Sequence, residues 1–246
     1  MRLNTEGLII KEQTVGESDR LVTVLTAELG IIRAFVRNAI KVKSRLQSAT
    51  QLMSYSRLSV YRGRDSYIID EAEPKEVFFG LRENIEKITL AQYFCELCYE
   101  LAPEEDKADR FLSLVLNALY LLSENKGKPD VIKSVVELRM LGLAGYLPNL
   151  VACEKCGEFE TDTMFFDIAT GNLYCEKCRG NTNAKALSIG VVTAMRHICY
   201  AEPKKIFNFK LSELGEKMLS EITEQYLFSR TNRRYKTLEF YKAMKN

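Results

Sequence analysis

Several residue types and motifs are scarce or missing in this chain of 246 residues. Tryptophan is absent and His197 is the only histidine, which argues against a histidine-ligated catalytic metal and against a Ser-His-Asp triad. His197 stands beside Ile198 in an apolar stretch, so we expect a structural role for it. No glycine-rich phosphate-binding motif occurs, so nothing favours a nucleotide cofactor. We therefore expect a binding protein and not an enzyme.

Long apolar segments are also missing. No run of about 18 apolar residues is present, and the first residues include no apolar stretch, so we expect neither secretion nor membrane insertion. The protein is expected to be cytoplasmic. In such a compartment the seven cysteines are expected to be thiols or metal ligands and not disulfides.

Acidic residues are missing from residues 31–64, although Asp and Glu (33) nearly balance Lys and Arg (35) over the whole chain. This basic segment carries eight cations: Arg33, Arg37, Lys41, Lys43, Arg45, Arg57, Arg62 and Arg64. A solvated basic face is one interpretation. The other is a surface that binds a polyanion.

Aromatic residues between these cations favour the second interpretation. In an extended strand Arg33, Phe35 and Arg37 share one face, because side chains alternate with a period of two. The same alternation groups Tyr55, Arg57 and Tyr61 on a later strand. Cations that follow phosphates and rings that stack on bases suit unpaired nucleic acid. We predict that this surface includes ten residues: Arg33, Phe35, Arg37, Lys41, Lys43, Arg45, Tyr55, Arg57, Tyr61 and Arg64.

Residues 1–80 contain five segments with strand alternation, at residues 5–13, 20–26, 31–37, 51–62 and 66–72. Five closely spaced strands indicate a small closed barrel of the OB type. The longest gap, residues 38–50, is expected to be a flexible basic loop. We predict an OB-fold nucleic-acid-binding domain over residues 1–80.

The periodicity changes to three and four after Pro74, which predicts an α-helical domain over residues 81–246. Helices are expected from Ile85 to Leu101, around residues 111–122, from Pro129 towards Gly145, from the N-cap Ser188, and around residues 214–226. Cys95 and Cys98 lie on the apolar stripe of the first of these helices, so we interpret them as core residues. The fold class is therefore α+β.

Two C-x-x-C pairs are separated by eighteen residues: Cys153 with Cys156, and Cys175 with Cys178. This spacing is typical of a zinc ribbon, here at about residues 149–183 with a hairpin turning at Ala169–Gly171. Four thiolates fill a tetrahedral shell, so we predict one structural Zn²⁺. A zinc hydrolase would need an open coordination position, which four sulfurs do not leave.

A second basic cluster follows the last predicted helix: Arg230, Arg233, Arg234 and Lys236. Residues 185–246 contain twelve basic and six acidic residues, whereas residues 81–184 carry a net charge of −6. The cluster is interpreted either as a solubilising surface or as a site for DNA or a protein tail.

Several strings of the sequence resemble the bacterial RecO family of recombination mediators. They are residues 15–21 (VGESDRL), 26–30 (TAELG), 43–46 (KSRL), 61–63 (YRG), 137–142 (ELRMLG) and 145–150 (GYLPNL), the last leading into Cys153. The likeness spans nearly the whole chain. Many members have a glycine before the basic loop, where this chain has Asn38.

The resemblance implies an OB domain followed by a helical domain with a zinc ribbon. It also implies a role in DNA repair and recombination, through binding of single-stranded and duplex DNA and annealing of complementary strands. With RecR, such a protein would help RecA to replace single-strand binding protein, whose acidic tail the helical domain would receive. The alternative is a zinc-ribbon scaffold for repair or transcription proteins, with incidental nucleic-acid binding.

Overall fold

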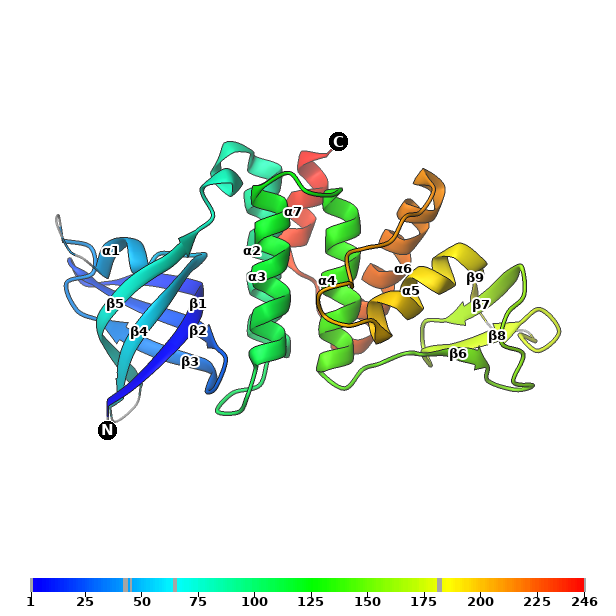
Figure 1. The fold of residues 1–246 in the computed structure, drawn as a ribbon, viewed down its shortest axis with the longest axis horizontal. Helices are drawn as coiled ribbons and strands as arrows, with labels where there is room; N and C mark the ends of the chain where they lie inside the picture. Colours follow the sequence, from blue (N-terminus) through cyan, green and yellow to red (C-terminus); the bar gives the residue numbers. More distant parts are fainter. Residues whose placement is uncertain (1, 42–43, 45, 64–65, 181–182, 246) are drawn as a thin grey trace. The chain divides into compact units, whose positions relative to one another are not determined.

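The structure is a computed structural model that describes residues 2–41, 44, 46–63, 66–180 and 183–245. The chain divides into two compact units (Figure 1). Unit 1 comprises Met1–Lys126 and Tyr235–Asn246, and unit 2 comprises Gly127–Arg234. No helix of the described residues is long and apolar enough to cross a membrane.

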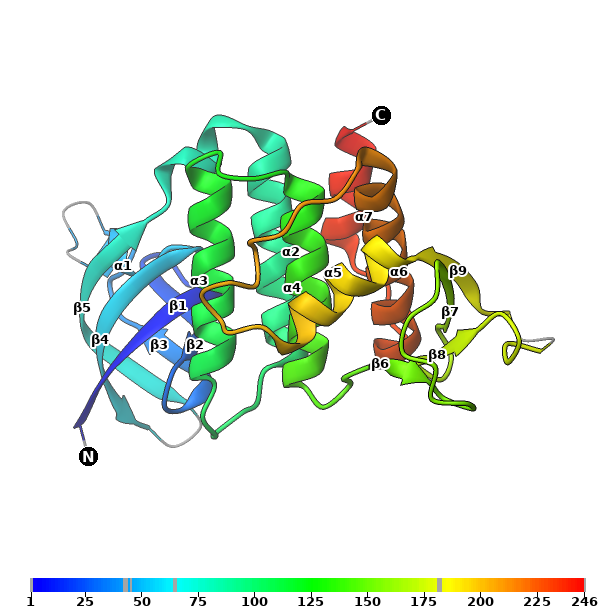
Figure 2. The same ribbon diagram turned by 45° about the vertical axis from the view of Figure 1, so that its right-hand side comes forward.

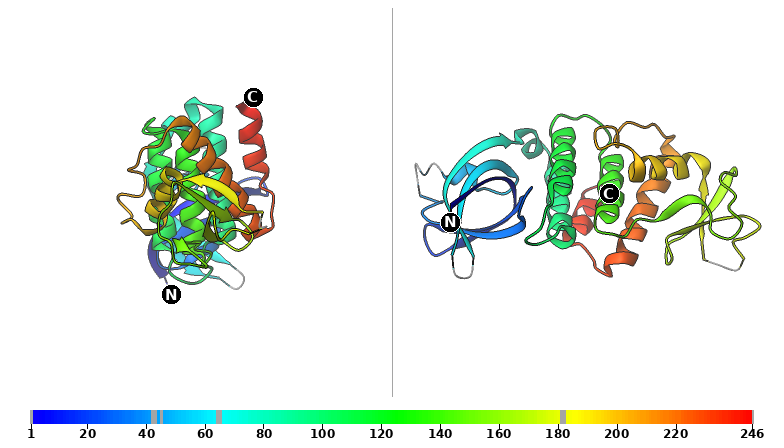
Figure 3. Two further views of the ribbon diagram at one scale, coloured as in Figure 1. Left: turned by 90° about the vertical axis from the view of Figure 1, so that its right-hand side faces the viewer. Right: turned by 60° about the horizontal axis from the view of Figure 1, so that its bottom comes forward.

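Unit 1 contains a closed barrel (Figure 3, right). Its described strands follow the order β1-β2-β3-β5-β4. The bounds are β1 (Arg2–Val15), β2 (Asp19–Thr26), β3 (Gly30–Val36), β4 (Ser54–Arg62) and β5 (Tyr67–Val77). Inward residues such as Val24, Ile32, Leu58 and Ile69 build its core. Among the described strands of the barrel, the β3–β5 pair is parallel and the other pairs are antiparallel, and this arrangement confirms the predicted OB-like barrel.

The predicted bounds of three strands and one loop need correction. β4 begins at Ser54, three residues later than predicted. β1 extends to Arg2 and Val15, and β5 continues beyond Ala72 to Val77. Pro74 lies within β5 beside a register shift in the β4–β5 pairing, where a residue without a backbone N–H is tolerated. Residues 38–50 are not entirely a loop, because Leu46–Ala49 form the short helix α1.

Helices complete unit 1: η1 (Phe79–Glu83), α2 (Ile85–Leu101), α3 (Asp109–Ser123) and α7 (Lys236–Met244). The last of these was not predicted; it packs against α2 (Figure 1). Cys95 and Cys98 are fully buried in α2, and burial raises the pKa of Cys95 to about 12. This confirms them as core residues.

Unit 2 contains α4 (Pro129–Leu143), α5 (Ile189–Tyr200), α6 (Glu213–Thr231) and a small sheet (Figure 2). The sheet has the order β6-β8-β7-β9, with β6 (Asn149–Cys153), β7 (Thr163–Asp167), β8 (Asn172–Cys175) and β9 (Lys185–Ser188). Ser188 precedes α5 as predicted, but its side chain makes no capping hydrogen bond. The His197 Nε2–H donates to the Lys205 carbonyl at 2.8 Å, as expected of a structural residue.

Candidate nucleic-acid interface and metal centre

The predicted alternation of β3 is present in the barrel. Arg33 and Arg37 are exposed and Phe35 is half-buried, whereas Ile32, Ala34 and Val36 are in the core. Arg33 Nη2 donates to the Tyr99 hydroxyl of α2 at 3.0 Å. One side of β3 therefore presents Arg33 and the Phe35 ring outside the barrel. Arg37, predicted on the same strand, is exposed in the turn that follows β3.

On β4, Tyr55, Arg57 and Tyr61 point outward and Leu58 and Val60 point into the core. The side chains at the Tyr55 end already have partners. The Tyr55 hydroxyl donates to Glu6 Oε2 at 2.6 Å, and Lys75 Nζ lies 5.2 Å from the centre of its ring. Burial and the hydrogen bond to Glu6 raise the pKa of Tyr55 to about 12.

Arg57 has two acidic neighbours. Its guanidinium lies 3.5 Å from Glu73 of β5 and 3.9 Å from Glu6 of β1. The basic segment lacks acids in sequence, but the strands that pair with β4 supply them. The cationic charge at Arg57 is therefore partly offset, which sequence inspection of residues 31–64 does not reveal.

β5 lies between β3 and β4 and connects their outward rings. Phe35 pairs in register with Ile68, and Ile68 pairs with Tyr61. Directly paired residues present their side chains on the same face of a sheet, and all three are half-buried. We call Phe35, Ile68 and Tyr61 the apolar row. Sequence reasoning missed Ile68, because alternation gives faces but not strand order.

The remaining predicted residues of this surface follow β3 or lie in loops. Lys41 is exposed. Lys43, Arg45 and Arg64 lie outside the described residues. The structure thus places Phe35 and Tyr61 in the apolar row, with Arg33 on the same face of β3. Tyr55 and Arg57 lie beside carboxylates farther along β4.

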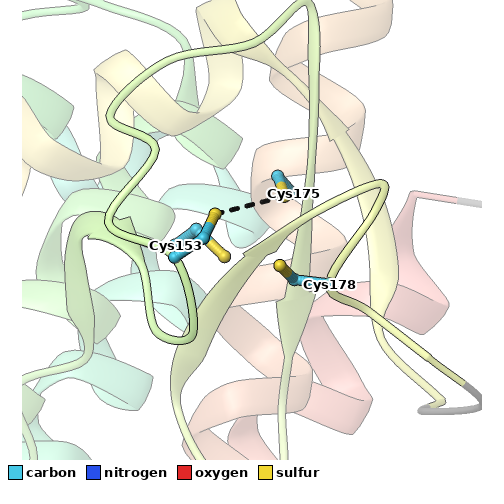
Figure 4. Close-up of side chains that lie close together, drawn as sticks. Cys153, Cys175 and Cys178 are labelled. Carbon is cyan, nitrogen blue, oxygen red and sulfur yellow. Dashed lines mark hydrogen bonds between the residues drawn. The ribbon is translucent and has the colours of Figure 1, made fainter.

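The four predicted metal ligands are brought together in unit 2. The Sγ atoms of Cys153, Cys156, Cys175 and Cys178 all lie within 4.8 Å of one another, and Cys156 Sγ is 3.7 Å from Cys175 Sγ. Figure 4 shows Cys153, Cys175 and Cys178 converging from two turns. A tetrahedral ion with metal–sulfur distances of about 2.3 Å would separate its ligands by roughly 3.8 Å. The cluster fits a metal ion.

Both pairs occupy tight turns that return the backbone towards the first cysteine. The Gly157 N–H donates to the Cys153 carbonyl at 2.9 Å, and the Arg179 N–H donates to the Cys175 carbonyl at 3.0 Å. Gly157 has φ 73°, a conformation that favours glycine. Local backbone hydrogen bonds therefore define both turns without any contribution from a metal ion.

The thiols of the cluster differ in proton affinity. Burial by itself would raise the pKa of Cys153, but backbone hydrogen bonds from Cys175, Cys156 and Lys155 outweigh it and lower that pKa to about 6. Side-chain hydrogen bonds with Cys156 and Cys175 raise the pKa of Cys178 to about 12. A divalent cation bound by the four sulfurs would displace the protons that the thiols retain.

Arg230 of the second basic cluster has a structural position. Its Nη2 donates to the Ile168 carbonyl (2.8 Å) and to the Ala169 carbonyl, and its guanidinium lies 4.8 Å from the centre of the Tyr226 ring. These contacts fix the β7–β8 turn to α6, so the Arg230 guanidinium is already engaged in contacts within unit 2. Arg233, Arg234 and Lys236 are exposed, and binding at these three stays a prediction.

Comparison with known proteins gives matches over almost the whole chain. Family models described as "Recombination protein O N terminal" and "Recombination protein O C terminal" match residues 1–78 and 82–239. A "DNA repair protein RecO" of Acetivibrio thermocellus is 32% identical over 243 residues, covering 98% of this chain and 97% of the relative. The protein of the same name from Alkaliphilus metalliredigens is 27% identical, covering 99% and 100%.

Proposed function

The chain belongs to the RecO family of DNA repair proteins, and from this premise we propose that it binds single-stranded DNA through its barrel. It would also bind duplex DNA, anneal complementary strands and help to load RecA onto DNA coated by single-strand binding protein, together with RecR. In this proposal it acts by binding, without bond-making chemistry of its own, in the cytoplasm at the nucleoid.

The apolar row is the observation that carries this proposal. Phe35, Ile68 and Tyr61 form a continuous outward strip across β3, β5 and β4, with the exposed cation Arg33 on the same face of β3 and the exposed Arg37 in the turn after β3. Rings with adjacent cations favour single strands, because duplex DNA offers no free base faces. The proposed surface retains all ten residues predicted from the sequence, with the row at its centre.

The metal of the four-cysteine cluster is proposed to be one structural Zn²⁺. Four sulfur ligands suit zinc, and a closed shell leaves no position for an activated water. Cys153, Cys156, Cys175 and Cys178 would hold the ion and tie β6 to β8. Zinc would then contribute folding free energy to the ribbon and no catalytic step.

Charge reversal tests the DNA-binding surface. We expect Arg37→Glu combined with Lys41→Glu to weaken binding to a 20-nucleotide oligothymidylate. The loss should be similar for single strands of other base sequences, because phosphate contacts do not depend on the bases. The slope of log affinity against log salt should flatten by roughly 0.7 for each phosphate that the variant no longer neutralises. The measurement is fluorescence anisotropy at several salt concentrations. Unchanged affinity and slope would remove the surface from the proposal.

A matched control is available on the helices. Arg110→Glu combined with Lys217→Glu makes the same change of net charge at two exposed positions of α3 and α6. If the control variant lost affinity as strongly as the test variant, the effect would reflect net charge and not a surface on the barrel. The expected result is a much smaller loss in the control.

The second candidate function is a protein-interaction scaffold. Exposed apolar side chains of the ribbon favour it. Val151 and Phe159 are 56% and 55% exposed. These two apolar side chains therefore lie largely outside the buried core of the ribbon. A scaffold would bind protein partners without annealing complementary strands. An annealing assay with two complementary labelled oligonucleotides separates the candidates, because the leading proposal requires faster annealing by the isolated chain.

A further inference from the structure

The edge of β3 beyond its pairing with β5 is closed by the connection between α2 and α3. In the part of the chain that the structure describes, β3 pairs with β5 at Ala34–Val36. Before that point, the Ile31 N–H donates to the Pro103 carbonyl at 2.9 Å, and Glu104 forms isolated bridges with Gly30 and Ile31. We call residues 103–106, Pro-Glu-Glu-Asp, the acidic loop.

This acidic loop is held at both ends. A side chain at Gly30 would collide with the Pro103 carbonyl oxygen, so glycine permits the close approach at one end. At the other end, the Ala108 N–H donates to the Ala27 carbonyl at 2.9 Å. The loop backbone is therefore fixed to the barrel, and only its side chains are free to move away.

A cleft of about 350 Å³ lies beside the loop, lined by Arg33, Arg62, Ser66, Tyr67 and Glu105 among others. Arg33 and Arg62 come from different strands, and guanidinium groups bind phosphate oxygens well. Arg33 lines this cleft and lies on the same outer face of β3 as Phe35 of the apolar row, two residues along the strand. A strand stacked along the row would therefore reach this cleft.

Glu105 already places an anion at the cleft. Its Oε1 lies 3.2 Å from Arg62 Nη2, and its φ of 56° is a left-handed conformation that costs energy for a residue with a side chain. The two side chains are 70% and 67% exposed, so the ion pair is weak and easily exchanged. A phosphate and this carboxylate would compete for the same guanidinium.

We infer that the cleft is a phosphate subsite for single-stranded DNA, in which Arg62 binds the backbone and Glu105 is a built-in competitor. The inference rests on the proposed DNA binding and adds Arg62, Ser66 and the acidic loop to it. The loop sets the affinity of the barrel below the maximum its cations would give, so that bound strands are released more readily.

The test is a cycle of variants with a 20-nucleotide oligothymidylate as the probe. Glu105→Gln should tighten binding roughly two- to five-fold, the range of one exposed ion pair, and should steepen the salt slope by up to about 0.7. Glu105→Asn, a residue that adopts positive φ more readily, should act in the same direction. Arg62→Gln should weaken binding, and Glu105→Gln should give no gain when Arg62 is already glutamine.

Glu17→Gln provides the matched control, because it removes one carboxylate from the exposed turn between β1 and β2. If Glu105→Gln gained no more than Glu17→Gln, the subsite would be overturned. The experiments distinguish failure of the phosphate subsite from failure of the proposed DNA binding. Loss of binding in Arg37→Glu/Lys41→Glu with no gain in Glu105→Gln would overturn only the inference, whereas a wild-type chain that fails to bind the probe would overturn both.

Discussion

Lys133 and Glu137 form an ion pair one turn apart on α4, with Nζ 3.0 Å from Oε1 and side chains only 2% and 0% exposed. Glu224 of α6 adds a second carboxylate at 3.2 Å, and the Thr223 hydroxyl donates to Glu137 at 2.7 Å. Burial alone would lower the pKa of Lys133, but the two carboxylates outweigh it and raise that pKa. The packing of α4 on α6 therefore depends on a satisfied charge network.

Removing the cation of this network should destabilise unit 2 strongly. Lys133→Met leaves Glu137 buried without its ammonium, a change that typically costs about 3–5 kcal/mol. We expect a decrease of that size in the free energy of unfolding, measured by urea denaturation. The control is Lys128→Met, which removes an exposed ammonium 2.6 Å from Glu216, and there a much smaller decrease is expected.

The sequence predicts strands and faces of the barrel well, because alternation depends on burial residue by residue. Ile32, Leu58 and Val60 are inside and Arg33 and Arg57 are outside, as expected. It does not predict the strand order, which arises from long-range pairing. That order places Ile68 between Phe35 and Tyr61, and it brings Glu6 and Glu73 to Arg57.

The cysteine cluster was predictable because the spacing of the two C-x-x-C pairs can be recognised in the sequence without knowledge of the fold. Arg230 was not, because its partners are the carbonyls of Ile168 and Ala169, about sixty positions earlier. A basic run in sequence does not distinguish a side chain that binds solvent from one that fixes a turn.

Glu6 should make the stability of unit 1 depend on acid pH. Hydrogen bonds from Lys75 and Tyr55 lower the pKa of Glu6 below its ordinary value of 4.5. Its stabilisation is present above the unfolded-state pKa and is lost as the pH falls through the folded-state pKa. Glu6→Gln should therefore flatten the stability profile below about pH 5 in urea denaturation. A decline equally steep in Glu6→Gln and in Glu76→Gln, which removes another exposed carboxylate of the barrel, would contradict this assignment.

Loss of one thiol should release the metal. We expect Cys178→Ser to reduce bound zinc from one equivalent to well below one, measured by elemental analysis after dialysis, and to lower the unfolding temperature of unit 2. Cys199→Ser is the control, because Cys199 is buried in α5 outside the cluster, and its zinc content should stay at one equivalent. Oligothymidylate binding by the barrel should persist in both variants; its loss in Cys178→Ser alone would mean that the ribbon takes part in DNA binding.

The two ends of the β4 face should respond differently to loss of a ring. Tyr61→Leu and Phe35→Leu each remove a ring from the apolar row, so each should weaken single-strand binding by about 1 kcal/mol or more, with a smaller effect on duplex DNA. Tyr55→Leu should cost less, because the Tyr55 ring already lies under Lys75 and its hydroxyl is bound to Glu6. Phe79→Leu, at an exposed ring of η1, should leave binding unchanged. The measurement is an anisotropy titration of each of the four variants. Equal losses of affinity in Tyr55→Leu and Tyr61→Leu would extend the stacking surface along all of β4. A loss of affinity in Tyr61→Leu and Phe35→Leu alone would confine the stacking surface to the apolar row.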